Sequence, residues 1–389
     1  MKVLSARQVK LYSTATSCLV AALSILWVVS AGPVTVYRTV RYNFSDVDDG
    51  RMFPRRTLTA APLPFRFRED VNPEIASLRI RVGARQDVPL RELIVASKTA
   101  AFLVIQDDVV LFEEHYGGYD RATPSLSFSV AKSVLSLLVG CALDDGYFRS
   151  VDQPVTDYVP ELAEKGFAAV RLRHLLQMTS GIDYAENDNP FGLNVRFYYT
   201  DRLEDEILKL VLREPPGRRF AYESSDAFLL TLALHRALGD KRIAEYMQER
   251  LWNPLGMEYD GAWSIDHAPD GLEKTGCCLA ASARDFAKFG RLYLNNGRWD
   301  RRRVVSEDWA TNSTAVDIRA GSAWESQRMW WLVSRGHLDL MAAGHLGQFL
   351  YVNPSARIII VRLGKSTGGL SRTEWGHVFV SLSESIPRR

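Results

Sequence analysis

Hydrophobic and polar residues follow the pattern of β-hairpins near both ends of the sequence. Residues 101–106 and 109–117 form two apolar, β-branched runs on either side of a two-residue Asp-Asp turn. Residues 347–352 and 357–363 form a second pair of such runs around a short turn that contains proline. Runs of this kind joined by a short turn predict antiparallel strand pairs.

Between the hairpins, apolar residues recur at helical spacing. Residues 203–214, 227–239 and 283–297 show this spacing, and the last two segments end at a glycine, a common helix stop. The final segment, 373–386, shows it as well. Strands at both chain ends with a helical middle indicate the α+β class. We expect an antiparallel β-sheet flanked by helices and built from both chain ends, together with a mainly helical lobe.

The first residues carry the pattern of an exported chain. Lys2, Arg7 and Lys10 precede the stretch 11–37, which contains no charged residue. One interpretation is a secretory signal cleaved near Ala31, and the other is an uncleaved helix that spans a bilayer with its basic end inside. The length of the uncharged stretch favours the anchor. In both cases we expect the rest of the chain on the periplasmic side of the cell membrane.

Residues 38–75 are predicted to form an extended connector. They contain an acidic cluster and several proline residues, with little hydrophobic periodicity. We therefore expect three parts: the anchor or signal segment at 1–37, the connector at 38–75 and a folded domain at 76–389.

Composition narrows the range of functions. With 48 basic and 46 acidic residues the net charge is +2, which gives no reason to expect a nucleic-acid partner. Cysteine and histidine show no metal-ligand spacing, so we expect neither a metal nor an organic cofactor. The adjacent Cys277 and Cys278 are expected not to bond each other, because the Cα atoms of bonded cysteines usually lie farther apart.

The main chemical signal is Ser129-Val130-Ala131-Lys132 at the start of an apolar helical pattern. Residues three apart share a helix face, so the side chains of Ser129 and Lys132 can touch. A serine hydroxyl is a weak nucleophile until a neighbouring base takes its proton. The alternative is an ordinary capped helix with an exposed lysine, but this helix is too apolar to lie on the surface.

Around this motif and in five further segments, the sequence resembles the serine β-lactamase and penicillin-binding protein family, particularly its class C-like esterase and 6-aminohexanoate-dimer hydrolase branch. The resemblance covers roughly residues 76–389 and implies a β-lactamase/transpeptidase-like fold with Ser129 as nucleophile. The similar segments, in order, are FSVAKS (128–133), ALDDGYFRSVDQPVTDYVPEL (142–162), LRHLLQMTSGI (172–182), PPGRRFAYESSDAFLL (215–230), AASARDFAKFGRLYL (280–294) and GHLGQFLYVNP (344–354).

The resemblance implies roles for further residues. The family's Y-x-N or Y-x-S motif falls on Tyr222-Glu223-Ser224. This match implies that the Tyr222 phenol, shared with Lys132, acts as general base and then as acid to the leaving group, with Ser224 at the substrate. A nearby positive charge favours the phenolate that such a role needs.

Two tripeptides compete for the family's strand motif, which is usually Lys-Thr-Gly. Lys274-Thr275-Gly276 matches it literally but leads into a helix, whereas His345-Leu346-Gly347 opens the C-terminal strand, where the family places the motif. We give the place of the motif before the C-terminal strand more weight than the identity of its residues. We therefore expect His345 and Gly347 at the substrate and regard the literal Lys-Thr-Gly match as coincidental.

Three smaller expectations complete the predicted site. The same alignment implies an oxyanion hole formed by the backbone N–H groups of Ser129 and Gln348. Trp331 is expected to wall the substrate pocket, with core packing as an equal alternative. The acidic loop 183–188 could receive a cationic substrate end, but a solvated loop is the favoured interpretation.

The sequence therefore predicts a serine hydrolase that cleaves small-molecule esters or short amides through an acyl-enzyme on Ser129. A β-lactamase or D-alanyl-D-alanine carboxypeptidase is the alternative within the same class. An alternative of another class is a membrane-anchored sensor or binding domain that is acylated but turns over little. The membrane is the second expected partner, through the N-terminal segment.

Overall fold

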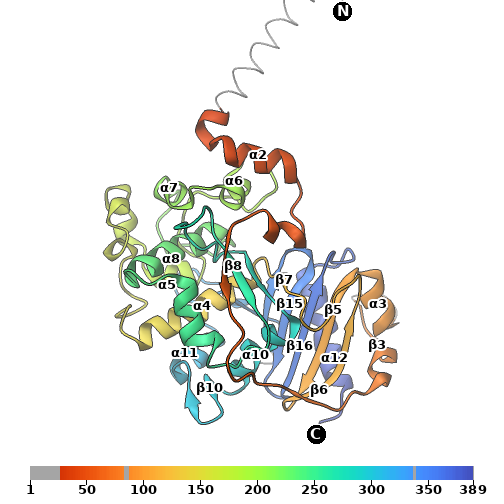
Figure 1. Ribbon diagram of the computed structural model, residues 1–389. Helices are drawn as coiled ribbons and strands as arrows, with labels where there is room; N and C mark the ends of the chain where they lie inside the picture. The colour runs from red at the N-terminus through yellow and green to blue at the C-terminus, as the bar shows by residue number, and fades with distance from the viewer. Residues whose placement is uncertain (1–26, 83–86, 336–338, 389) are drawn as a thin grey trace, which may run out of the picture.

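The centre of the molecule is an eight-stranded sheet in the order β12-β13-β14-β15-β16-β5-β6-β2 (Figure 1). The computed structural model describes residues 27–82, 87–335 and 339–388. Neighbouring strands are antiparallel, except that β2 and β6 are parallel. The strands are β2 Arg68–Glu69, β5 Thr99–Gln106, β6 Val109–His115, β12 Ser326–Gln327, β13 Trp330–Leu332, β14 Leu340–Gly344, β15 Gln348–Asn353 and β16 Ile358–Gly364.

Both predicted hairpins are present, and they meet in the middle of this sheet. β5 pairs with β6, and β15 pairs with β16. β16 then pairs with β5, with Ile360 opposite Val104, so the two ends of the chain are joined by one ladder. The predicted α+β class with a sheet built from both chain ends is confirmed.

Side chains of the central strands alternate between two hydrophobic cores, one on each face of the sheet. On β5, Leu103 and Ile105 belong to the core shared with the helical lobe, whereas Phe102 and Val104 belong to a smaller core on the other face. Helices α12 and α3 cover the smaller core, and Phe379 of α12 contacts Phe102 there. Burial on both faces explains why these strands read as almost continuous apolar runs.

The helical lobe packs on the first face, with α4 (Val130–Asp144) at its centre (Figure 1). This helix is buried along nearly its whole length, as its apolar sequence predicts. α8 (Ser224–Ala237) lies beside it, and α10 (Ala283–Leu294) packs on β15 and β16. The helix predicted over 203–214 is shorter, because α7 ends at Leu208 and the chain then forms a bridge between Leu212 and Ile182.

A smaller sheet, in the order β1-β8-β9-β7, lies between the lobe and the large sheet. Its strands are β1 Arg55–Leu58, β7 Ser125–Leu126, β8 Gly261–Ser264 and β9 Leu279–Ala281.

Two further strand pairs are β3 Arg79–Ile80 with β4 Val88–Pro89 and β10 Arg298–Trp299 with β11 Arg302–Arg303. The other helices are α2 Pro33–Tyr42, α3 Leu90–Ala96, α5 Leu172–Leu176, α6 Leu193–Tyr199, α7 Leu203–Leu208, α9 Ile243–Met247, α11 Glu307–Asn312 and α12 Arg372–Ser385. Short 3-10 turns are η1 Val47–Arg51, η2 Pro73–Ser77, η3 Val155–Asp157, η4 Pro160–Lys165, η5 Phe167–Ala169 and η7 His345–Gly347, and η6 Gln248–Trp252 is a π-helical turn.

The segment before residue 59 differs from the extended connector expected over 38–75. It forms α2, η1 and β1, and β1 pairs with β8 inside the small sheet. The buried Arg38 ties α2 to the lobe, because its Nη1 donates to the carbonyl oxygens of Tyr199 (3.1 Å) and Thr200 (3.3 Å). The buried side of α2 consists of Thr35, Arg38 and Thr39, and polar contacts of this kind leave no hydrophobic pattern in the sequence.

The anchor or signal segment predicted over 1–37 lies largely outside the described residues, which begin at 27. Within the described ranges, no helix has both the length and the apolar character that crossing a bilayer requires.

Candidate active site

Ser129 lies at the start of α4, directly after a sharp turn of the chain. The preceding residue, Phe128, has a φ of 44°, a left-handed conformation that is costly for a side chain of this size. Such conformations are concentrated at functional sites, where the surrounding structure holds them. The Ser129 side chain makes no capping bond to its own helix, so its hydroxyl remains available to the pocket.

Lys132 contacts Ser129 as the three-residue spacing predicts. The Lys132 Nζ donates to Ser129 Oγ and to the carbonyl oxygen of Gly276, both at 2.8 Å. Its side chain is buried. An amine held by two hydrogen bonds has a fixed direction toward the serine oxygen, which is the arrangement that proton transfer needs.

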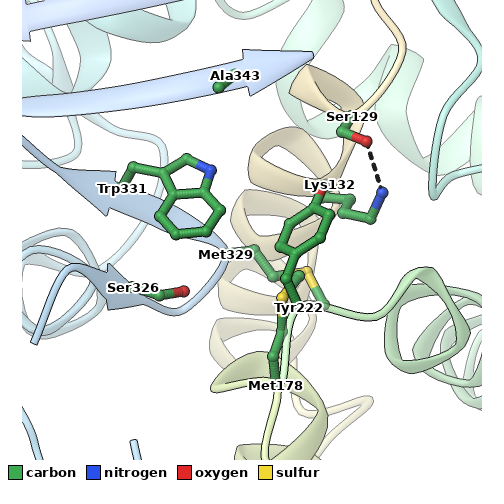
Figure 2. A pocket seen from close by; sticks show the side chains of 8 residues that line it. All are labelled: Ser129, Lys132, Met178, Tyr222, Ser326, Met329, Trp331 and Ala343. Atoms are coloured by element: carbon green, nitrogen blue, oxygen red, sulfur yellow. Dashed lines mark hydrogen bonds between the residues drawn. The ribbon is translucent and has the colours of Figure 1, made fainter. Parts of the chain in front are cut away.

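Tyr222 completes this group from the loop before α8. Lys132 Nζ lies 5.4 Å from the centre of the Tyr222 ring, and Figure 2 shows the two side chains against each other below Ser129. The Trp331 ring is next to Tyr222 at 5.4 Å, and the guanidinium of Arg372 stacks on Trp331 at 3.2 Å. Trp331 lines a small cavity together with Ser129, Lys132 and Tyr222. Its role as a wall of the substrate pocket stays a prediction.

A pocket of about 510 Å³ opens beside Ser129 and Lys132. Its walls come from the end of α2, the loop before α6, α6 itself, the start of α8 and the turn after β14. The lining residues are Asn43, Phe44, Ser45, Phe128, Ser129, Lys132, Glu186, Asn187, Asp188, Pro190, Asn194, Val195, Tyr198, Tyr199, Ser224, Phe228, Cys277, His345 and Leu346. The volume is that of a site for a small organic molecule.

One wall of this pocket is acidic. Glu186 accepts hydrogen bonds from the backbone N–H and the hydroxyl of Ser224, at 2.8 and 2.7 Å, and Asp188 lies on the same wall. Ser224 is therefore at the pocket but is held by a carboxylate. Behind it, burial raises the pKa of Glu223 to about 7 against the opposing influence of Arg213. Asp183, Glu186 and Asp188 are exposed, so the loop is solvated, as favoured, and it also contributes Glu186 and Asp188 to the pocket wall.

Gln348 does not line the pocket, and its buried side chain bonds the backbone of Gly364, as donor at 2.5 Å and as acceptor at 3.2 Å. These contacts concern the side chain, so the role expected of the Gln348 backbone N–H stays a prediction. The close approach to the nucleophile is made four residues earlier. A Cβ atom at Gly344 would lie 2.3 Å from the carbonyl oxygen of Ser127 and 3.1 Å from the nitrogen of Ser129. The alignment missed this contact, although the glycine is visible in the sequence.

His345 and Gly347 of the expected strand motif are separated by the structure. His345 lines the pocket and packs edge to face on Phe128, at 5.4 Å between ring centres. Loss of water around the imidazole lowers its pKa, an effect that Asp188 partly opposes. Gly347 instead packs on the buried Arg362, whose Nη1 donates to its carbonyl oxygen at 2.6 Å. The tripeptide forms the turn η7 between β14 and β15 and is not the opening of a strand.

The literal motif Lys274-Thr275-Gly276 has a part in the site, but not through its lysine. Lys274 is fully buried, and its Nζ donates to the carbonyl oxygens of Phe197 (3.1 Å) and Thr200 (3.3 Å). Burial lowers the pKa of Lys274 to about 7. Only Gly276 reaches the reacting group, by accepting the hydrogen bond from Lys132.

The prediction that Cys277 and Cys278 do not bond each other is wrong. A disulfide joins them, with a Cα–Cα distance of 3.7 Å. The N–H groups of both residues donate to the carbonyl oxygen of Lys274, so the chain turns tightly enough for the two sulfur atoms to meet. Cys277 lines the pocket next to Gly276, and this pair therefore forms part of the pocket wall.

Sequence reasoning also missed the contribution of the N-terminal segment. Asn43, Phe44 and Ser45 line the pocket although they fall in the expected connector. No local pattern marks them, because their position depends on the docking of α2 against α6.

In the described part of the chain, no group of three His, Cys, Asp or Glu side chains is arranged to hold a metal ion.

The fold and this group of side chains define a class of protein. A serine at a buried helix start, with a lysine and a tyrosine beside it, has the parts of a serine acyl-hydrolase. The helical lobe and the sheet built from both chain ends hold these parts together.

Comparisons with known proteins agree with this class. The family model described as Beta-lactamase matches residues 91–378. The 6-aminohexanoate-dimer hydrolase of Paenarthrobacter ureafaciens is 27% identical over 317 residues, which are 76% of this chain and 80% of that protein. A Bacillus anthracis structure assigned by name as a 6-aminohexanoate-dimer hydrolase superposes with a TM-score of 0.78 at 21% identity and covers 88% of this chain and 94% of its own. A family VIII carboxylesterase superposes with a TM-score of 0.57 at 16% identity, over 75% of this chain and 95% of its own.

The chain belongs to the β-lactamase family, and within it is a serine hydrolase of the kind that cleaves esters or amides. The resemblance seen in the sequence is confirmed at the level of the family and of the fold.

Proposed function

We propose that Ser129 is the nucleophile and that Lys132 and Tyr222 move its proton. The 2.8 Å contact between Lys132 Nζ and Ser129 Oγ is the observation that carries this proposal. Ser129 Oγ attacks the carbonyl carbon of an ester or amide, and its proton passes to the Lys132–Tyr222 pair. The pair returns the proton to the departing alcohol or amine, which leaves an acyl-enzyme on Ser129. A water molecule then adds to the acyl carbon and releases the carboxylic acid and the free serine.

The oxyanion of the tetrahedral intermediate needs two N–H donors next to Ser129 Oγ. We assign one to the backbone of Ser129, at the start of α4, where the helix dipole also favours negative charge. We assign the other to His345 in place of Gln348. Gly344 brings the strand end against Ser129, and His345, the next residue, lines the pocket.

The acidic wall supports a substrate with a cationic or neutral end. Glu186 and Asp188 line the pocket a short way from the nucleophile, and an ammonium group there would be attracted by both. The relative in Paenarthrobacter ureafaciens is named for the dimer of 6-aminohexanoate, a linear amide with an amine at one end and, five carbons from the amide nitrogen, a carboxylate at the other. We therefore favour linear esters or short amides over β-lactams and D-alanyl peptides, which carry a carboxylate next to the reacting bond.

We further propose that the hydrolase works on the outer side of the cell membrane. The support is the uncharged stretch 11–37 behind Lys2, Arg7 and Lys10. A protease added to spheroplasts tests this assignment, and we expect digestion of the hydrolase while a cytoplasmic marker stays intact. Protection of both proteins would contradict export.

The nucleophile is tested with a fluorophosphonate probe on the full chain. We expect one label per molecule, on the peptide that contains Ser129, and no label on the Ser129→Ala variant. Ser133→Ala is the matched control, since Ser133 lies one turn along the same helix and donates to the carbonyl oxygen of Met329. Labelling that survives in Ser129→Ala would overturn the assignment. Mass spectrometry after a short ester pulse shows whether the acyl adduct clears, as a hydrolase requires, or persists, as in a sensor.

A further inference from the structure

The outer face of α2 is unusually apolar for a surface helix. Exposed large hydrophobic side chains lie along it and along the helical turn before it, namely Val28, Val29, Val34, Tyr37, Val40 and Phe44. The neighbouring start of α6 adds Phe191 and Leu193. These residues, called the α2 face below, are more than half of the large hydrophobic side chains that are exposed in the described part of the chain. Exposed apolar side chains gathered on two neighbouring elements indicate a surface that meets something apolar.

α2 buries its polar side and exposes its apolar side. A helix on a globular protein normally buries its apolar side and exposes its polar side. In α2 the buried side chains are Thr35, Arg38 and Thr39, whereas Tyr37 and Val40 are 62% and 69% exposed. Burial in the protein interior therefore does not explain the apolar side of α2, because that side faces outward. An apolar environment outside the protein would explain it.

The sequence that leads into α2 indicates which apolar phase this is. Residues 11–32 of the uncharged stretch lie ahead of α2, and three basic residues precede them. A stretch of this length and polarity is sufficient to cross a bilayer. A helix that directly follows such a stretch emerges at the lipid surface, where an apolar side with aromatic residues is stable.

The pocket opens next to the same face. Phe44 ends the α2 face and also lines the pocket with Asn43 and Ser45. On the other side, Pro190 and Val195 line the pocket from the segment that holds Phe191 and Leu193. Figure 1 shows α2, α6 and α7 together at one end of the molecule, away from α12 and β6.

We propose that the α2 face docks on the lipid bilayer and holds the mouth of the pocket at the membrane surface. Its substrates are accordingly amphiphilic esters or amides that partition into the membrane, with the scissile carbonyl near the headgroups. This substrate class rests on the proposed hydrolase function, whereas the docking of the α2 face does not.

The docking is tested with a fluorescent label on the full chain in phospholipid vesicles. In a Cys18→Ser background, Val40→Cys is labelled with an environment-sensitive dye, and Val95→Cys is the matched control. Val95 is also an exposed valine on a helix, but that helix, α3, lies beside the large sheet (Figure 1). We expect nitroxide attached to the lipid chains to quench the label at residue 40 at least threefold more than the label at residue 95.

Two outcomes would overturn the docking. Quenching of the residue 40 label by aqueous iodide, without quenching by lipid nitroxide, would show that the face is in water. Protection from both quenchers would show that residues 1–26 or a second copy of the protein cover the face.

Activity provides an independent measurement. In a protein labelled at Tyr37→Cys, the Val40→Glu substitution should abolish quenching of the label by the lipid nitroxide. Val40→Glu should also hydrolyse a long-chain p-nitrophenyl ester in vesicles at least fivefold more slowly than the unmodified protein. Its rate on p-nitrophenyl acetate should stay within twofold of the unmodified protein, because Val40 does not line the pocket. Equal loss on both esters would overturn the link between docking and substrate. Absence of any ester hydrolysis in the unmodified protein would contradict the hydrolase function and leave the quenching result standing.

Discussion

At the scale of single residues, the site depends on a close approach of two backbone segments. Ser129 is at the start of α4, and the end of β14 lies directly against it, with Gly344 at the contact. A side chain at this point would separate the strand from the helix. The oxyanion hole that we propose needs both backbones at once, so its geometry depends on the missing Cβ atom.

Gly344→Ala should therefore abolish most of the activity while the protein stays folded. Its Cβ would meet the carbonyl oxygen of Ser127 at 2.3 Å, and the strand end must move to relieve the clash. Loss of one oxyanion donor lowers kcat by about 100- to 1000-fold. The measurement is kcat/KM for a p-nitrophenyl ester, with circular dichroism to verify folding. Gly50→Ala is the control, because a Cβ there makes only an ordinary contact at 3.6 Å. Equal activity of the two variants would argue against the proposed oxyanion hole.

Lys274 gives a second prediction at this scale, on stability. Its pKa is about 7 in the folded protein against an ordinary value of 10.5. Between pH 7 and 10.5 the unfolded state therefore binds more protons than the folded state, and stability rises with pH in this window. One such group contributes up to about 1.4 kcal/mol per pH unit. Lys274→Met should be less stable overall, since the carbonyl oxygen of Phe197 loses this donor and that of Thr200 keeps only Arg38. The added dependence of stability on pH should vanish in this variant. Urea denaturation at several pH values from 7 to 10 measures it, and identical slopes would contradict the shifted pKa.

The contact between Ser129 and Lys132 could be predicted because it is local. Two residues three apart on a helix must be neighbours, whatever the rest of the chain does. The partner of the same lysine, the carbonyl of Gly276, could not be predicted, because 144 residues separate the two in sequence. The choice of Gln348 as oxyanion donor depends on a similar long-range contact. Motif matching counted residues from the strand, whereas a turn, η7, lies between β14 and β15, and we propose His345 instead.

At the scale of elements, the N-terminal segment is part of the folded hydrolase. β1 is an edge strand of the small sheet, and α2 contacts α6, which lines the pocket. A protein that starts at residue 76 lacks both elements and one wall of the site. We expect it to be insoluble or inactive, and its expression beside the full chain measures this.

Arg38→Met is the more precise test of the same contact. The variant removes the Arg38 donor from the carbonyl oxygens of Tyr199 and Asp266, and it leaves that of Thr200 with Lys274 alone. Hydrogen bonds to a charged group contribute about 1.5–3 kcal/mol, so we expect a loss of roughly 2–3 kcal/mol in the free energy of unfolding. Arg41→Met on the exposed side of the same helix should change it by less than about 0.5 kcal/mol. Similar values for both variants in urea denaturation would mean that α2 is not anchored through Arg38.

The elements that the sequence predicted well are those with strong periodic patterns. Both hairpins and α4, α8, α10 and α12 lie where the apolar residues placed them, because these elements bury apolar faces. α2 escaped prediction since its buried side is polar. The end of α7 at Leu208 was missed because Leu210 is buried by a loop and Leu212 packs through a bridge, although both fit the helical spacing.

At the scale of the whole molecule, the charges around the pocket set the substrate preference. Glu186 and Asp188 stand on one wall, and the residues that precede Gly344 on the strand are two alanines. His345 lines the pocket, and burial lowers its pKa, which favours the neutral imidazole. We therefore expect no permanent cation of β14 or η7 to face the carboxylate of a β-lactam, and we expect the acidic wall to disfavour it.

The size of the expected preference for esters over β-lactams can be estimated from the missing hydrogen bond. A charge-assisted hydrogen bond to a substrate carboxylate contributes about 1.5–3 kcal/mol, so its absence costs roughly one to two orders of magnitude in kcat/KM. We expect a short p-nitrophenyl ester with an amino group at its acyl end to exceed a chromogenic cephalosporin by at least this factor. His345→Lys should shift the ratio toward the cephalosporin, whereas His345→Gln, which is neutral, should not. As the pH falls from 8 to 6.5, the ratio in the unmodified protein should shift less than a histidine with an ordinary pKa would cause, because burial lowers the pKa of His345. If the cephalosporin is the better substrate, another cation holds its carboxylate, and Arg372, stacked on Trp331 at the edge of the site, is the first residue to replace.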